Sequence, residues 1–212
     1  MREGVFEIYR DDQQVGTEEY HTWSSPTGDT LIALSVSTYD LDGDPDSSEY
    51  SKQTLELTQT LDQLPLYFQV IENSEGVIFT GSASFRDTLV QIYQEGENGG
   101  RAWTLVVPEG KKFVLDPGTY QLLEFLLGSF AQRGIAKRTH QVFVLRTRKV
   151  ISVNLTRLGE ENIEWPEGQT TGAIVAELSD GITAFKGWFD EEGRLLILDA
   201  PSYRTRVVRR AP

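Results

Sequence analysis

The sequence predicts a mainly β protein: one strongly curled antiparallel sheet of roughly a dozen strands, a half-barrel, wrapped around one apolar helix at about residues 118–133. Short runs that alternate polar and apolar residues recur along the chain, and turn-forming residues separate them. Only one segment has the length and the apolar surface of a buried helix. Since no stretch has the composition of a linker, we expect residues 1–212 to form a single half-barrel domain.

The first half of the chain predicts a meander of antiparallel strands. In residues 53–62 three leucines fall on one face of a strand, and threonine and glutamate fall on the other. Glu75-Gly76 and Arg86-Asp87 are typical of the turns that reverse a chain between neighbouring strands. The predicted strands of this half are 4–10, 15–24, 30–40, 53–62, 66–71, 77–83, 88–93 and 103–107.

The predicted helix follows Asp116-Pro117 and ends near Gly134. An aspartate can cap the free amides of a helix start, and proline suits the first helical position. A surface helix has an apolar stripe along one side, whereas this one is apolar around most of its circumference, so we expect the sheet to enclose it. Its large apolar side chains are those of Tyr120, Leu122, Leu123, Phe125, Leu126, Leu127 and Phe130.

The β pattern resumes after the helix. Turn residues such as Asp180-Gly181 and Pro201-Ser202 again separate the runs. Because each strand twists relative to its neighbour, a sheet with this many antiparallel strands tends to curl, which would leave a groove between its concave face and the helix. The predicted strands of this half are 141–146, 150–158, 173–178, 182–189, 195–199 and 203–209.

Composition argues against several functional classes. The net charge is −12, with −15 in residues 1–100 and +3 in residues 101–212, so nucleic acid and anionic membrane surfaces are unfavourable partners. The chain has no cysteine and only two histidines, which removes thiolate chemistry and argues against a histidine-rich metal site. We therefore expect no metal and no cofactor. No apolar run is long enough to cross a membrane as a helix, and the sequence leaves the oligomeric state open.

The order of segments resembles uncharacterised bacterial envelope proteins that are related in fold to the lipoprotein-localisation carriers. The segments that carry this resemblance are 4–10 (GVFEIYR), 15–20 (VGTEEY), 105–110 (LVVPEG), 114–116 (VLD), 187–190 (GWFD) and 193–196 (GRLL). The resemblance implies a half-barrel in the periplasm or cell envelope and supplies no catalytic residues. Met1 is the only methionine, which fits an initiator placed on a chain whose signal peptide has been removed; a cytoplasmic protein is the alternative.

One acidic segment has the oxygen ligands that calcium prefers. It contains Asp40, Asp42, Asp44, Asp46 and Glu49. The EF-hand pattern fails, because Pro45 replaces the glycine of the sixth loop position and Ser51 the bidentate glutamate of the twelfth. A solvated hairpin turn is therefore the favoured interpretation.

The remaining polar motifs predict structure rather than chemistry. His21 and His140 are far apart in the sequence, and no serine lies in a Gly-x-Ser-x-Gly elbow. Two basic stretches lack the regularly interleaved aromatic residues and the overall charge of a nucleic-acid site; they consist of Arg133, Lys137, Arg138, Arg146, Arg148 and Lys149, and of Arg204, Arg206, Arg209 and Arg210. We expect them to pair with the acidic strands of the first half or to form a solvated face.

Three functions from different classes follow from these features. The leading one is a non-enzymatic envelope protein that binds or carries a lipid-like apolar ligand in the groove between sheet and helix. The second is a structural or protein-interaction domain with a filled core, and the third is a hydrolase with an unrecognised site. The predicted ligand-binding residues are Leu123, Phe125, Leu126, Leu127, Phe130, Trp103 and Trp188.

Overall fold

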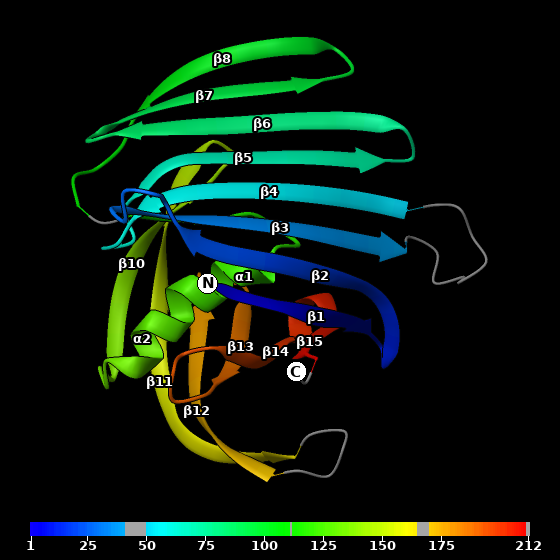
Figure 1. The fold of residues 1–212 in the computed structure, drawn as a ribbon, viewed down its shortest axis with the longest axis vertical. Helices are drawn as coiled ribbons and strands as arrows, with labels where there is room; N and C mark the ends of the chain where they lie inside the picture. Colours follow the sequence, from blue (N-terminus) through cyan, green and yellow to red (C-terminus); the bar gives the residue numbers. More distant parts are fainter. Residues whose placement is uncertain (41–49, 111, 165–169, 211–212) are drawn as a thin grey trace.

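The computed structural model describes residues 1–40, 50–110, 112–164 and 170–210, and these form a mainly β structure (Figure 1). The acidic segment at 41–49, considered above for calcium, lies outside the described residues. The strands are β1 (Arg2–Arg10), β2 (Gln13–Ser24), β3 (Thr30–Asp40), β4 (Tyr50–Thr60), β5 (Pro65–Ser74), β6 (Val77–Arg86), β7 (Leu89–Gly96), β8 (Gly99–Val106), β9 (Lys112–Leu115), β10 (Lys137–Val144), β11 (Lys149–Glu164), β12 (Thr170–Ser179), β13 (Ala184–Phe189), β14 (Leu195–Ala200) and β15 (Thr205–Arg209).

All described strands belong to one sheet of 15 strands in the order β8-β7-β6-β5-β4-β3-β2-β1-β15-β14-β13-β12-β11-β10-β9. The two ends of the chain therefore meet in the middle of the sheet, where β1 pairs antiparallel with β15. Neighbouring strands are antiparallel throughout the described residues except for β9 and β10, which are parallel. The helix makes the connection between those two, as parallel strands require a crossover.

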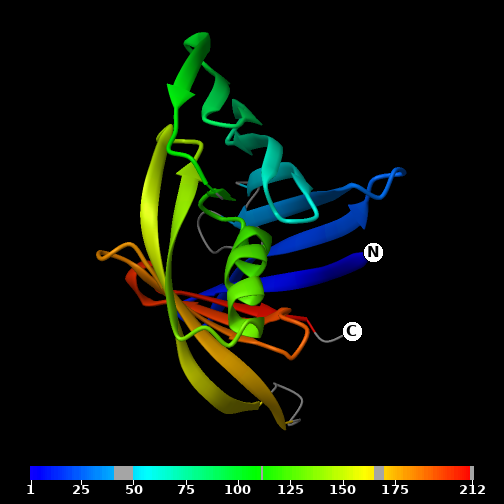
Figure 2. The ribbon, with the colours of Figure 1, turned by 90° about the vertical axis from the view of Figure 1, so that its left-hand side faces the viewer.

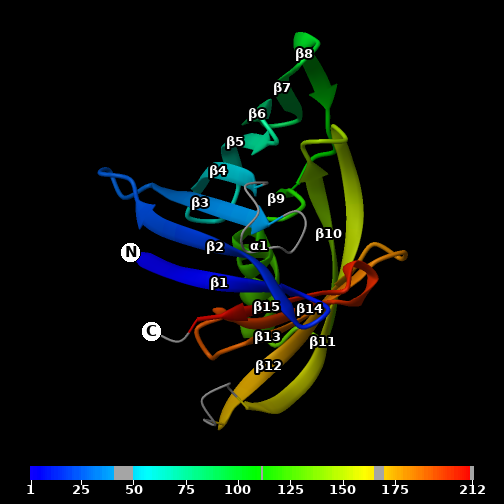
Figure 3. The same ribbon diagram turned by 90° about the vertical axis from the view of Figure 1, so that its right-hand side faces the viewer.

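The expected large antiparallel sheet is confirmed, but the expectation that it is strongly curled is wrong. The sheet stays open, with β8 and β9 as its two edges, and it is not strongly curled. It nevertheless bends enough that β1–β3 lie on one side of the helix and β10–β12 on the other (Figures 2 and 3). The described strands also outnumber the predicted dozen. The strand absent from the predicted ranges is β9, which has only four residues and lies just before the helix.

The reversals at two hairpins have the predicted turn chemistry. Asp11 and Asp12, between β1 and β2, have φ values of 50° and 65°, and Glu75 and Gly76, between β5 and β6, have values of 51° and 82°. Two consecutive residues of positive φ form the turn whose twist matches that of the flanking strands. Aspartate and glycine tolerate this conformation well, so these residues fix the pairing of the strands beside them.

The helix runs from Tyr120 to Gln132 in three consecutive parts: α1 (Tyr120–Leu123), a π-helical turn η1 (Glu124–Gly128) and α2 (Ser129–Gln132). The sequence placed it at about 118–133. Its side chains are buried along almost its whole length, which confirms the predicted enclosure. A short 3-10 turn, η2 (Pro201–Tyr203), joins β14 to β15.

Asp116 does not cap this helix, contrary to the sequence prediction. Its carboxylate accepts hydrogen bonds from Gln53 Nε2 at 2.6 Å and from Arg146 at 3.2 Å, while Thr119 at the helix start makes no side-chain cap. The cap comes instead from β2. Glu18 accepts hydrogen bonds from the backbone amides of Tyr120 at 2.6 Å and of its neighbour Gln121 at 3.3 Å. A carboxylate at a helix start also meets the positive end of the helix dipole.

The buried side chains form two large apolar clusters and a small one. The first lies between the helix and strands β1, β2 and β10–β15, with Phe6, Leu126 and Phe189 fully buried in it. The second lies between β3–β8 on one side and β9 and β10 on the other, and contains Phe68 and Phe143. The third is a small cluster on β11–β14.

Several arginines pair with acidic residues of the first half, as the sequence predicts. Arg204 contacts Asp11 at 2.6 Å, and Arg210 contacts Glu7 at 2.9 Å. These ion pairs join β15 and the turn before it to β1 and the turn after it. Exposed pairs of this kind contribute little stability each, so their main effect is on register and solubility.

Candidate functional site

The residues predicted to bind a ligand lie in three different places. Leu123, Leu126, Leu127 and Phe130 are at most 6% exposed and form the helix side of the first apolar cluster. They contact the sheet directly, and none of them lines the groove described below. Their ligand-binding role stays a prediction, and their observed contacts are those of a packed core.

The other three predicted residues are aromatic and only partly buried. Phe125 and Trp103 pack against the second apolar cluster, and the Arg148 guanidinium lies 4.4 Å from the centre of the Trp103 ring. Trp188 packs against the third cluster and donates a hydrogen bond from Nε1 to Glu161 at 2.9 Å. The seven side chains therefore do not form one site.

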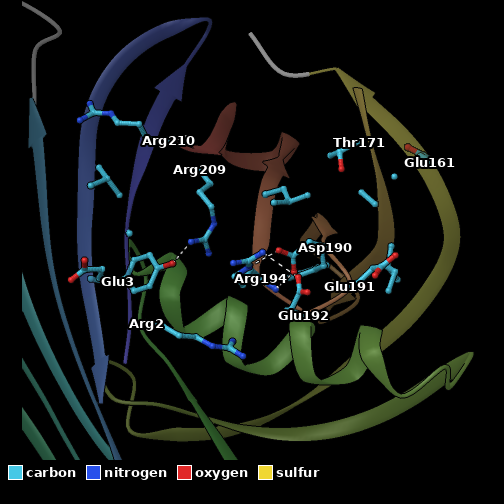
Figure 4. A pocket seen from close by; sticks show the side chains of 18 of the residues that line it. Arg2, Glu3, Glu161, Thr171, Asp190, Glu191, Glu192, Arg194, Arg209 and Arg210 are labelled. Carbon is cyan, nitrogen blue, oxygen red and sulfur yellow. Dashed lines mark hydrogen bonds and ion pairs between the residues drawn. The ribbon is translucent and has the colours of Figure 1, made fainter. Parts of the chain in front are cut away.

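The structure has an open groove elsewhere, above the helix, with a volume of about 1460 Å³ (Figure 4). On one side its wall is formed by the start of β1 and the end of β2, and on the other by the end of β11 and the start of β12. The turn between β13 and β14 and the end of β15 complete it. We call this space the mouth groove.

Arg209, one of the residues that line the groove, belongs to a buried ion pair. Arg209 of β15 donates hydrogen bonds to the Glu124 carboxylate, to the Tyr20 hydroxyl and, at 2.7 Å, to the backbone carbonyl of Leu195. The side chains of Arg209 and Glu124 are 12% and 5% exposed. Glu124 also accepts a hydrogen bond from the Leu195 amide at 2.8 Å, so it ties the helix to the start of β14.

Electrostatics in this ion pair follow from burial and neighbouring charge. Burial raises the pKa of Glu124, while Arg209, the Leu195 amide and Arg2 oppose that rise. Burial likewise raises the pKa of the Tyr20 phenol to about 12, so it stays protonated and can serve as a hydrogen-bond donor or acceptor. The ionised Glu124 is thus stabilised by the arginines around it.

Gly4 makes room for this arrangement. A side-chain carbon added at Gly4 would lie 2.7 Å from the Tyr20 hydroxyl and 2.9 Å from Nη1 of Arg209. The guanidinium lies 5.1 Å from the centre of the Phe6 ring and 5.4 Å from that of Tyr20, which holds it against two aromatic faces. The position of Arg209 is therefore determined by contacts on several sides.

The turn between β13 and β14 brings further charge to the groove. Arg194 contacts Asp190 at 2.5 Å and Glu192 at 3.1 Å, so its charge is matched within the turn. Arg2, Arg194 and Arg209 extend into the groove from three different elements (Figure 4).

Apolar residues also belong to the lining. Val5 and Ile174 are partly buried, and Ala173, Phe189 and Leu196 are buried in the apolar clusters behind it. A groove with apolar walls and a few convergent charged groups is the usual form of a small-molecule site.

The described lining of the groove contains one histidine and two hydroxyl side chains. The histidine is His21, whose Nδ1 is 3.4 Å from the Glu3 carboxylate, but no serine belongs to this lining and its hydroxyls are those of Thr171 and Tyr20. His140 lies elsewhere, with its ring centre 5.0 Å from that of Phe113. In the described part of the chain no three metal-binding side chains gather, and no helix there is long and apolar enough to cross a membrane.

Comparison with known proteins supports the fold. No family model matches the chain, and no curated protein matches it. The chain is similar to a β-barrel-like protein of the domain of unknown function DUF1849 from Brucella abortus, with a TM-score of 0.59 and 11% identity over 98% of this chain and 94% of that one. It also matches a DUF1089 family protein from Pseudomonas aeruginosa, with a TM-score of 0.45 and 14% identity over 88% and 90% of the two chains.

The two structural similarities differ in what they support. At 11% identity the first shows the fold alone, and the second is too distant to add to it. Neither structure is described as a lipoprotein-localisation carrier, so the relation to those carriers stays an expectation from the sequence. The chain thus has a β-barrel-like fold built on one open antiparallel sheet.

Proposed function

We propose that this protein is a non-enzymatic binding protein that holds an amphipathic, lipid-like ligand in the mouth groove. The observation that carries the proposal is the groove itself, in which apolar walls and convergent charged side chains share one open space of about 1460 Å³. Sites for drug-sized molecules are typically about 300–1,000 Å³, so this one has room for a longer ligand. The apolar part of the ligand would lie along Val5 and Ile174, the apolar lining residues that are only partly buried.

The proposed site differs in place from the one expected from the sequence. The helix side chains are covered by the sheet, so the ligand lies above the helix in the mouth groove. The segment-order resemblance supports a location in the periplasm or cell envelope, and that location is part of the proposal. Native mass spectrometry of protein exported in its own host would reveal a retained ligand as added mass.

The direct test uses a bulky side chain that narrows the groove. Gly172 lines it, and a side-chain carbon there would have its nearest contact at 3.9 Å, with Asn162 Oδ1, so a side chain can begin at this position without strain and Gly172→Trp is the variant of choice. Gly96, at the end of β7, also has open space around it and lies outside the groove, which makes Gly96→Trp the matched control. We expect Gly172→Trp to weaken binding of a fluorescent dodecyl probe and Gly96→Trp to leave it unchanged. Equal binding by both variants would contradict the proposal.

One observation favours a hydrolase as a second candidate. His21 lies in the mouth groove beside the Glu3 carboxylate, an arrangement that can orient an imidazole as a general base. Without a serine or cysteine in the groove lining, that base would have to activate water. Hydrolysis of p-nitrophenyl esters that is lost in His21→Ala, with ligand binding intact, would establish this candidate over the first.

The tightly packed helix favours a structural or protein-interaction domain as the third candidate. Leu126 and Leu127 are fully buried against the sheet, so the core is filled by the protein itself. This candidate predicts that the mouth groove takes up no amphiphile of any kind, which the probe experiment above measures directly.

A further inference from the structure

We infer that the mouth groove selects amphiphiles with an anionic head group, a carboxylate or a phosphate, and that Arg2 and Arg209 bind this head. The inference rests on the proposed function, since it assigns the polar end of the ligand to one side of that groove. It depends on the geometry of two arginines that reach the same space from β1 and β15 (Figure 4).

Arg209 has donors left over after its protein contacts. A guanidinium carries five N–H groups. Three of them are directed to the Leu195 carbonyl, the Tyr20 hydroxyl and the Glu124 carboxylate. Since the side chain lines the groove and retains some exposure, the remaining N–H groups are available to a ligand oxygen there. Two N–H groups in a fixed planar fork match the oxygens of a carboxylate or phosphate.

The position of Arg209 is fixed before any ligand arrives. Its guanidinium is in contact with the Phe6 and Tyr20 rings and hydrogen bonded on three sides. A donor held in this way loses little conformational entropy on binding, so more of the interaction energy appears as affinity.

Arg2 supplies a second positive charge that the protein does not neutralise. Within the described residues Arg2 has no carboxylate within ion-pair distance, yet it is close enough to Glu124 to favour its ionised form. Glu124 offsets one of the two arginines, so Arg2, Arg209 and Glu124 together carry a net charge of +1.

The other charges of the groove place the head group at this end. Asp190 and Glu192 are on the turn between β13 and β14, where they pair with Arg194, and Glu191 of the same turn adds a negative charge. Arg210 forms an ion pair with Glu7. Glu19 of β2 and Glu160 and Glu161 of β11 add further negative charge to the lining. Attraction for an anionic head is therefore local to Arg2 and Arg209, and repulsion by the surrounding carboxylates orients the ligand along the groove.

The test compares three dodecyl amphiphiles below their micelle concentrations: dodecanoate, dodecyl maltoside and dodecyltrimethylammonium. Binding is measured by calorimetry for the wild-type protein, for Arg2→Gln, and for Arg101→Gln on the exposed edge strand β8 as the control. We expect dodecanoate to bind tightest. Arg2→Gln should weaken its binding roughly tenfold, the size of one charge-assisted hydrogen bond, and leave dodecyl maltoside unchanged. Arg101→Gln should change neither.

The outcomes separate this inference from the proposed function. If no amphiphile binds, the proposed function fails, and the inference fails with it. If all three bind with similar affinity and Arg2→Gln has no selective effect, the groove is a binding site but its head-group selectivity is not anionic. Tightest binding of dodecyltrimethylammonium would likewise overturn the inference while leaving the groove as the binding site.

Discussion

Glu18 gives a quantitative test of how the helix is held in the sheet. Its carboxyl group is fully buried, and burial raises its pKa from 4.5 to about 7, against the lowering effect of hydrogen bonds from the amides of Tyr120 and Gln121. Nearby Glu124 raises it further. Replacing Glu18 by glutamine removes the titration and keeps the shape of the side chain.

The sign of the effect follows from proton binding. In the unfolded chain Glu18 loses its proton near pH 4.5, whereas the folded protein keeps it until about pH 7. Between these values the folded state binds the extra proton, so raising the pH favours unfolding. The shift of about 2.5 pKa units corresponds to about 3 kcal/mol of stability, present in full below pH 4.5 and lost by about pH 7.

The assay is chemical denaturation followed by tryptophan fluorescence at a series of pH values from 4.5 to 8, with the free energy of unfolding extrapolated to water. The difference between wild type and Glu18→Gln isolates this one group, because every other titration is common to both. We expect that difference to move by about 3 kcal/mol against the wild type as the pH rises. Glu19→Gln, an exposed neighbour, is the control. A difference that does not depend on pH would refute the assignment of Glu18.

Three further predictions concern packing and charge. Leu126→Ala should cost about 2–5 kcal/mol of unfolding free energy, and Leu126→Asp should prevent folding, because Leu126 is fully buried; circular dichroism melting measures both. Gly128→Ala should lower the melting temperature markedly, since its added carbon would lie 2.1 Å from the Gly193 carbonyl oxygen. Burial raises the pKa of Asp116 from 3.8 to about 6 despite the adjacent Arg146, so the wild type should lose stability from this group too as the pH rises to about 6. Asp116→Asn should abolish that loss, and urea titrations at several pH values would measure it.

Much of the fold follows from local pattern. Alternation of apolar residues at every second position places the strands, and turn residues such as Asp11 and Asp12 place the reversals. The apolar circumference of the segment around Leu126 correctly predicts an enclosed helix. These features depend on residues close together in the sequence, where pattern is informative.

Long-range contacts account for what the sequence could not predict. Asp116 has the right position for a helix cap, but Glu18, 102 residues away from Tyr120, takes that role. The openness of the sheet depends on which strands form its edges, and no local pattern encodes the pairing of β1 with β15. The ion pair at the mouth groove joins Arg209 of its lining to Glu124 of the helix, 85 residues apart. The only sequence signal for that pair is Glu124 itself, one of few charged side chains in an apolar helix.

The pairing of β1 with β15 has a consequence for how the molecule is made. The middle of the sheet is complete only when the last strand, Thr205–Arg209, joins the first, so β1–β8 and β9–β14 are not bridged by hydrogen-bonded strands until then. Contacts between residues so distant in the sequence are slow to form. During synthesis the residues up to Arg209 must leave the ribosome before β1 finds its second neighbour, and the strand remains an open edge until that moment.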